Sequence, residues 1–279
     1  MGSTLLKIKC LYDTLGRGEK KIADWMLEHP KELIGMSISE LAVACGCGDA
    51  TVVRFSKRLG LSGYQALKIN IAQELGSNPT GIQSIHSGDS CMAIFSKHAA
   101  DIAVTLERTK DTLSEAILTE TAKCLLNAKN IVILGLGSSA PIAMDAMHKF
   151  QRAGLPAYAY SDNHMQMIVT SHLEPGDAVL AISHSGSSTD IVTALEQAKE
   201  KGATTISITN RGRSPIARYS DYLLPTNAEE TKYTILAMSS RIAQLAIIDT
   251  LYTYIVLNGG EQIMQAVRET ECALETKKY

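Results

Sequence analysis

The sequence predicts two folded parts: an all-α helix-turn-helix domain at residues 1–77 and an α/β domain at residues 107–279. Residues 78–106 between them are expected to hold a linker and a lead-in helix. A stretch rich in Gly, Ser, Asn and Pro at residues 76–90 has the composition of a linker. Before it, apolar residues recur at helical spacing, whereas from residue 131 short apolar runs alternate with helical patterns. That alternation indicates a five-stranded parallel sheet flanked by helices on both faces.

The first part contains no convincing strand pattern. Its apolar positions recur every three or four residues, and a proline interrupts the first set because proline cannot occupy a helix interior. After the linker, residues 91–128 are expected to form one or two helices. The expected strands are Ile131–Leu134, Ala157–Tyr160, Ala178–Ile182, Thr204–Ile208 and Tyr222–Leu224, and the expected helices are one ending at Phe150 and others at 163–172, 188–201 and 239–257.

The bulk composition places the chain among globular proteins, with 45% hydrophobic and 20% charged residues. No apolar run approaches the roughly 20 residues of a membrane-spanning helix, and the first ten residues lack the features of a secretory signal. We therefore expect a cytoplasmic protein with no membrane partner. The formal net charge is −2, but residues 1–77 hold 10 Lys and Arg against 8 Asp and Glu. This small excess has the sign that a DNA-binding domain requires.

The six cysteines form no paired framework. The closest pair, Cys45 and Cys47, has a spacing unusual for zinc, and no histidine or cysteine cluster completes it. We expect buried, reduced thiols, with no metal and no cofactor.

Residues 39–59 carry a helix-turn-helix pattern. Two helices that cross closely need a small residue at the contact, which Ala42 provides, and a turn residue that tolerates a left-handed conformation, which Gly46 provides. The outward face of the second helix would then offer its first residues to DNA bases and its basic residues to phosphates. The candidate DNA-binding residues are Asp49, Ala50, Thr51, Val53, Arg54 and Lys57. The alternative is a plain helical hairpin with a solvated basic face, although Lys57, Arg58 and Lys68 favour DNA.

Two loops rich in glycine and hydroxyl groups follow expected strands and open helices. They are Gly135–Ser139 and Ser183–Thr189. A helix N-terminus favours an anion through its free N–H groups and its dipole, and ligands of open α/β sheets bind at the carboxyl ends of strands. Neither loop has the lysine of a nucleoside-triphosphate loop or the third glycine of a dinucleotide site. A phosphate monoester suits them, the alternative being an N-cap with leftover polar residues. The candidate ligand residues are Gly137, Ser138, Ser139, Ser183, Ser185, Gly186, Ser187 and Ser188.

The chain resembles the RpiR family of bacterial regulators, in which a helix-turn-helix domain precedes a SIS (sugar isomerase) domain. The matching segments are Ala50–Gly60, Gly63–Lys68, Gly135–Ser139, Ile182–Ser188 and Met238–Arg241. The resemblance implies that Ser139, Ser183, Ser185 and Ser188 bind a phosphosugar, with close backbone approach at Gly186. It also makes Glu230 a candidate partner of the sugar hydroxyls, with Glu229 as its rival. Many relatives have Ser-Pro where this chain has Gly48-Asp49, and the Asp49 carboxylate would repel a nearby phosphate.

The resemblance implies a DNA-binding transcriptional regulator, expected to be a repressor of carbohydrate or amino-sugar genes and not an enzyme. Its partners would be a sugar phosphate, a palindromic or repeated operator, and a second copy in a homodimer or homotetramer. Hexosamine, N-acetylmuramate, pentose and gluconate phosphates all fit the same loops. The main alternative is an aldose–ketose isomerase, for which Glu229, Glu230, His164, His172 and His184 are acid–base candidates. A sensor that acts through protein partners is the third alternative.

Overall fold

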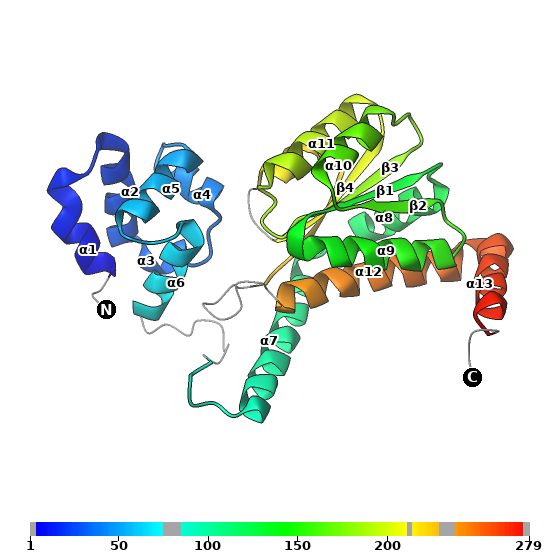
Figure 1. The fold of residues 1–279 in the computed structure, drawn as a ribbon, viewed down its shortest axis with the longest axis horizontal. Helices are drawn as coiled ribbons and strands as arrows, with labels where there is room; N and C mark the ends of the chain where they lie inside the picture. Colours follow the sequence, from blue (N-terminus) through cyan, green and yellow to red (C-terminus); the bar gives the residue numbers. More distant parts are fainter. Residues whose placement is uncertain (1–3, 75–84, 211–213, 229–237, 276–279) are drawn as a thin grey trace. The chain divides into compact units, whose positions relative to one another are not determined.

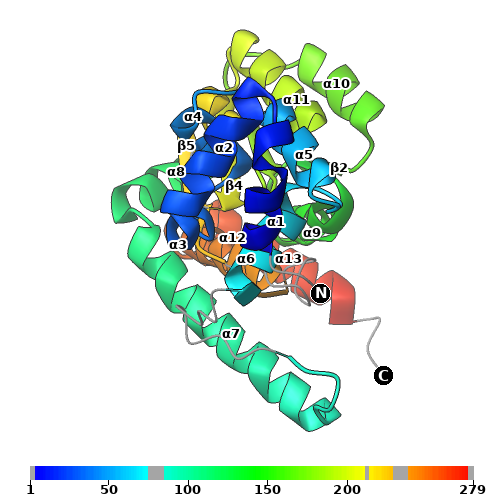
Figure 2. The same ribbon diagram turned by 90° about the vertical axis from the view of Figure 1, so that its left-hand side faces the viewer.

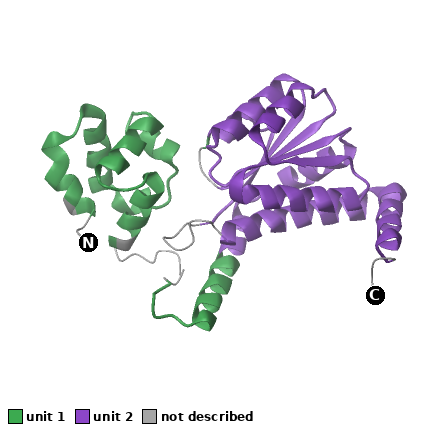
Figure 3. Ribbon diagram, viewed as in Figure 1, with its two compact units in different colours: residues 1–104, 212–214, 229–237 green, residues 105–211, 215–228, 238–279 purple. Residues whose placement is uncertain are grey.

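The computed structural model describes residues 4–74, 85–210, 214–228 and 238–275. Inter-residue contacts divide the chain into two compact units (Figure 3): residues 1–104 belong to the first, together with 212–214 and 229–237, and residues 105–211, 215–228 and 238–279 form the second. The expected linker at 76–90 falls largely on residues outside the described ranges.

The first unit contains a bundle of short helices (Figure 1). They are α1 (Thr4–Leu11), α2 (Arg17–Glu28), α3 (Pro30–Leu33), α4 (Ile38–Ala44), α5 (Asp49–Arg58) and α6 (Tyr64–Glu74). Their apolar faces meet in one core around Ile22, Leu41 and Phe55, which are fully buried. Ser37 begins α4 with a capping box, in which its hydroxyl accepts the Glu40 N–H and the Glu40 carboxylate accepts the Ser37 N–H. These contacts set the entry to the helix-turn-helix.

A single helix, α7 (Cys91–Thr112), follows the linker and runs as one uninterrupted rod (Figure 2). The second unit then contains α8 (Glu115–Asn127), which Ser114 caps. The break between α7 and α8 shows that residues 91–128 form two helices, one of the two expected arrangements.

The sheet is parallel throughout and has the strand order β2-β1-β3-β4-β5. Its strands are β1 (Ile131–Gly135), β2 (Ala157–Tyr160), β3 (Ala178–Ile182), β4 (Thr204–Asn210) and β5 (Tyr222–Thr226). Two strands coincide with the expected ranges, and β1, β4 and β5 run one or two residues further. They are longer because the added residues still pair with a neighbouring strand, as Gly135 does with Ile182 and Asn210 with Thr226.

Helices cover both faces of the sheet (Figure 1). They are α8, α9 (Ala140–Arg152), α12 (Met238–Asn258) and α13 (Gly260–Glu275) on one side, and α10 (Asn163–Ser171) and α11 (Thr189–Glu200) on the other. Alternate residues of each strand enter the two cores: Ile131 and Ile133 contact the first side, whereas Val132 and Leu134 contact the second. This confirms the expected parallel sheet flanked by helices. The helix α13 was not expected, and it packs against α9 through Ala266, beside Gly154.

Among the described residues, no single helix is long and apolar enough to cross a bilayer, and only the pair α12 and α13, bent by 115°, meets that criterion by length and composition together.

Candidate functional site

The helix-turn-helix is formed by α4, a tight turn and α5. Gly46 adopts a left-handed conformation with φ of 59°, as the sequence predicts. The Cys47 N–H donates to the Ala42 carbonyl oxygen at 2.9 Å and closes the turn over the small residue. Val52 and Phe55 on the inner face of α5 are fully buried. The opposite face of α5 is therefore available to a partner.

On that face, Ala50, Arg54 and Lys57 are exposed, and Asp49, Thr51 and Val53 are half-buried. Asp49 accepts a hydrogen bond from the Ser39 hydroxyl at 2.8 Å, so its carboxylate is tied to α4 at the beginning of α5. The Arg54 guanidinium lies 3.5 Å from the Thr51 hydroxyl, a contact too long to hold it firmly.

Two basic residues that support DNA binding in the sequence analysis, Arg58 and Lys68, instead form contacts within the domain. Arg58 forms an ion pair with Glu19 at 2.8 Å and donates to the Thr14 carbonyl oxygen at 2.6 Å. These two contacts join the end of α5 to the beginning of α2 and the residues just before it. Lys68 donates to the Met36 carbonyl at 2.8 Å. Arg54 and Lys57 thus remain as the cations of the candidate DNA-binding face.

The cysteines also depart from expectation. Only Cys45 is buried, and burial raises the pKa of its thiol to about 11. Cys10, Cys91 and Cys272 are exposed, because each occupies an outer position of its helix, so the expectation of buried thiols is wrong for these three. No group of three His, Cys, Asp or Glu side chains in the described ranges could hold a metal.

The two hydroxyl-rich loops lie side by side. One follows β1 and the other follows β3, and these strands are neighbours whose last residues, Gly135 and Ile182, pair directly. From β1 the chain passes to β2 on one side, whereas β3 lies on the other side. The loops therefore meet at the topological switch point of the sheet, where open α/β folds bind ligands.

The first loop turns sharply into α9. A Cβ at Gly135 would lie 2.7 Å from the Ser139 carbonyl oxygen, so only glycine fits there. Gly137 has a φ of 56° and begins a short 3-10 turn that ends at Ser139. Ser139 is buried directly before α9, and no described residue hydrogen-bonds to its hydroxyl.

The second loop is held by its backbone. The Ser183 N–H donates to the Ile208 carbonyl at 3.1 Å, and the Gly186 carbonyl accepts the Ile216 N–H at 3.0 Å. Gly186 has a φ of 59°. Ser188 occupies the N-cap position of α11 without its side chain making a capping bond, so the N-cap alternative does not account for that hydroxyl.

The sequence did not indicate how this loop connects to α12. The Nδ1 atom of His184 lies 2.6 Å from the hydroxyl oxygen of Ser240, in the first turn of α12. In the same helix, the Ser239 hydroxyl and both polar atoms of the Gln244 amide are buried without a hydrogen-bond partner among the described residues. A buried polar atom without a partner is costly, so within the described part of the chain these atoms of Ser239 and Gln244 can still form hydrogen bonds.

Among the described acid–base candidates, His184 lies within the second loop, whereas His164 and His172 lie at the two ends of α10. His164 is exposed at the beginning of α10, and His172 is exposed just after that helix, toward the opposite edge of the sheet. His184 contacts Ser240. Glu229 and Glu230 lie outside the described residues.

Comparisons with known proteins agree with this architecture. Residues 2–78 match the helix-turn-helix domain of the rpiR family, and residues 124–254 match the SIS domain. An uncharacterized HTH-type transcriptional regulator of Caldanaerobacter subterraneus is 37% identical over 279 residues, covering 100% of this chain and 99% of the relative. The HTH-type transcriptional regulator HexR of Pseudomonas aeruginosa is 32% identical over 280 residues, covering 100% and 98%.

Solved structures show the same fold. The Vibrio vulnificus NanR protein complexed with ManNAc-6P superimposes with a TM-score of 0.79, covers 99% of each chain and is 22% identical. The sugar isomerase domain of an RpiR transcription factor from Sphaerobacter thermophilus has a TM-score of 0.56 and 23% identity, covering 63% of this chain and 96% of that one. The chain belongs to the RpiR family of helix-turn-helix transcriptional regulators with a SIS domain.

Proposed function

We propose that this regulator represses genes of carbohydrate or amino-sugar metabolism and that a sugar phosphate bound in the SIS domain controls it. The main support is the meeting of two hydroxyl-rich loops at the switch point of the sheet, each at the N-terminus of a helix. The regulator acts in the cytoplasm, on an operator that is palindromic or repeated.

The phosphate-binding residues are Gly137, Ser138, Ser139, Ser183, Ser185, Gly186, Ser187 and Ser188. No described residue hydrogen-bonds to the hydroxyls of Ser139, Ser183 and Ser188, so these three can donate to phosphate without breaking a structural bond. The N-termini of α9 and α11 add backbone N–H groups and a favourable dipole. Glu230 is the proposed partner of the sugar hydroxyls. The complex of the Vibrio vulnificus NanR protein with ManNAc-6P supports this ligand class.

DNA binding is assigned to the outward face of α5. Arg54 and Lys57 contact phosphates, and Asp49, Ala50, Thr51 and Val53 lie toward the base edges. Because one recognition helix reads one half-site, a homodimer or homotetramer presents two helix-turn-helix domains, called heads below, to two half-sites.

The bond between His184 and Ser240 supports a route from the ligand to the rest of the SIS domain. A phosphate held by Ser183 and Ser185 contacts both neighbours of His184 in the chain, and any shift of that residue moves the first turn of α12. The ligand changes DNA affinity only by its differential affinity for the two arrangements of the heads.

A thermal-shift screen of sugar phosphates and their unphosphorylated parent sugars tests the proposal. We expect one phosphate to raise the melting temperature while its parent sugar does not. The same compound should then release the protein from promoter DNA and remain chemically unchanged on prolonged incubation. Conversion to an isomeric sugar phosphate would instead show an isomerase, and the absence of any shift would contradict the assigned site.

A further inference from the structure

We propose that two copies of this chain pair through antiparallel α7 helices, with Phe95 of each copy inserted into an apolar groove of the other. This inference rests in part on the proposed function, because a regulator with one head needs a second copy to read a two-part operator. Two features of the molecule support the pairing: an apolar groove beside the end of α7 and an exposed apolar stripe on its first half.

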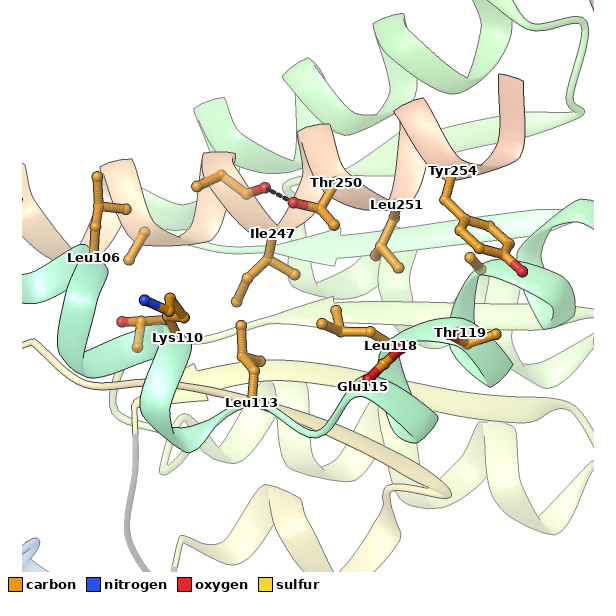
Figure 4. Close-up of a pocket in the computed structure, with 14 residues that line it drawn as sticks. Leu106, Lys110, Leu113, Glu115, Leu118, Thr119, Ile247, Thr250, Leu251 and Tyr254 are labelled. Atoms are coloured by element: carbon orange, nitrogen blue, oxygen red, sulfur yellow. Dashed lines mark hydrogen bonds between the residues drawn. The ribbon is translucent and has the colours of Figure 1, made fainter. Parts of the chain in front are cut away.

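The groove lies between the end of α7, the helix α8 and the helix α12, and its volume is ≈ 550 Å³ (Figure 4). Leu106 and Leu113 form one wall, and Ala243, Ala246 and Ile247 form the facing wall on α12. The side chains of Leu113, Leu118 and Ile247 point into the space between the helices (Figure 4). An apolar groove of this kind favours an apolar occupant over water.

The stripe lies on the first half of the same helix. The stripe consists of Met92 and Phe95, which are 72% and 68% exposed. Together with Ala99, Ile102 and Leu106, the stripe forms an apolar series along α7. The steps of three, four, three and four residues place this series on one face of α7, which is the spacing of a helix–helix seam. The series contains no charged residue, so repulsion between like charges does not oppose the pairing of two such helices along it.

Within one chain, the side chains of the stripe cannot reach the groove. Phe95 and Leu106 are eleven residues apart on one straight helix, a separation of about 16 Å. A second copy related by a two-fold axis can satisfy both at once, because a two-fold interface places the same patch of each copy against the other. The steps of the series read the same from either end when Thr109, which also lines the groove, is included. An antiparallel partner helix therefore matches it.

The groove fixes the register of the pair. When the two-fold axis passes midway between Ala99 and Ile102, Phe95 of one copy lies level with Leu106 of the other. In the same register Met92 lies level with Thr109, so both exposed side chains enter the partner's groove. The small Ala99 lies opposite Ile102 near the axis, which lets the helices approach closely. Dimerisation through α7 pairs the two chains at the first helix after the linker that follows each helix-turn-helix domain.

Charge substitutions test this register by analytical ultracentrifugation. Phe95→Glu places a charge in the groove and should raise the dissociation constant at this interface at least about 100-fold. Leu106→Lys should do the same from the other side. Phe95 is exposed, so its substitution leaves the folded monomer intact, which circular dichroism verifies. Leu257→Glu, at a side chain that is 75% exposed on α12 and outside the stripe, is the matched control and should leave the assembly unchanged.

A mixture of Phe95→Glu with Leu106→Lys is the decisive sample. In the proposed register the carboxylate introduced into one copy would face the ammonium group introduced into the other, so the mixture should regain the assembly that neither variant forms alone. An unchanged assembly for Phe95→Glu, or a mixture that stays dissociated, would overturn the proposal. Sugar-phosphate binding is measured separately on each variant. A variant that binds the ligand and keeps its assembly would refute only this interface. A variant that dissociates and binds no ligand would refute only the proposed effector.

Discussion

The substitution Ser183→Ala separates ligand binding from folding and from DNA binding. Ser183 is buried directly after β3, its N–H is bound to the Ile208 carbonyl, and no described residue hydrogen-bonds to its hydroxyl. Removing that hydroxyl therefore leaves no group of the described residues without its partner. We therefore expect the free energy of unfolding without ligand to change by less than about 0.5 kcal/mol.

The ligand, in contrast, should lose one hydrogen bond to a charged phosphate, which is worth about 1.5–3 kcal/mol. That loss corresponds to a dissociation constant raised about 10- to 150-fold. Isothermal titration calorimetry with the sugar phosphate found in the thermal-shift screen measures this change, and fluorescence anisotropy with operator DNA should give the wild-type affinity. Ser171→Ala removes a hydroxyl from the far end of α10 and is the matched control. Wild-type ligand affinity in Ser183→Ala would refute the assignment of the loop.

Three further substitutions or measurements address the rest of the molecule. Arg54→Ala should weaken operator binding in anisotropy measurements at least about tenfold and leave ligand binding unchanged; normal DNA binding would reject the face assigned to α5. Burial raises the pKa of Asp221, but hydrogen bonds from Thr205 and Lys199 outweigh burial and hold that pKa below its usual value. The resulting stabilisation is present at neutral pH and is lost as the pH falls below about 4, so Asp221→Asn should flatten the acid side of a plot of melting temperature against pH, and an unchanged plot would contradict this reasoning. Titration with a thiol reagent at pH 8 should modify the exposed cysteines quickly and Cys45 only on unfolding, because burial raises the pKa of its thiol to about 11; rapid loss of all thiols would show that the core of the head opens readily.

Local patterns predicted much of this protein. The edge strand Ala157–Tyr160 and the buried strand Ala178–Ile182 have the predicted bounds, because turn residues mark both ends of each short apolar run. Gly46 has the left-handed conformation that the tight turn of a helix-turn-helix requires. The motifs of the two loops were equally visible, since glycines and hydroxyls followed strands and preceded helices.

Roles that depend on distant partners could not be predicted in this way. Arg58 and Lys68 carry the same charge as Arg54, but they form contacts within the helix-turn-helix domain. Folding brings Glu19 and the Thr14 carbonyl oxygen to Arg58, and the Met36 carbonyl oxygen to Lys68. The exposure of Cys91 depends on which face of α7 other elements cover.

The candidate ligand site shows the same division. Two hydroxyl-rich loops that open helices were predictable from the chain alone, because the residues that make such a loop are contiguous. That the loops adjoin, through the pairing of β1 with β3, and that His184 contacts Ser240 across 56 positions of the chain, became visible in the folded molecule and not before. The reason is physical: backbone conformation follows from neighbouring residues, whereas strand order and contacts between distant side chains follow from how the whole core packs.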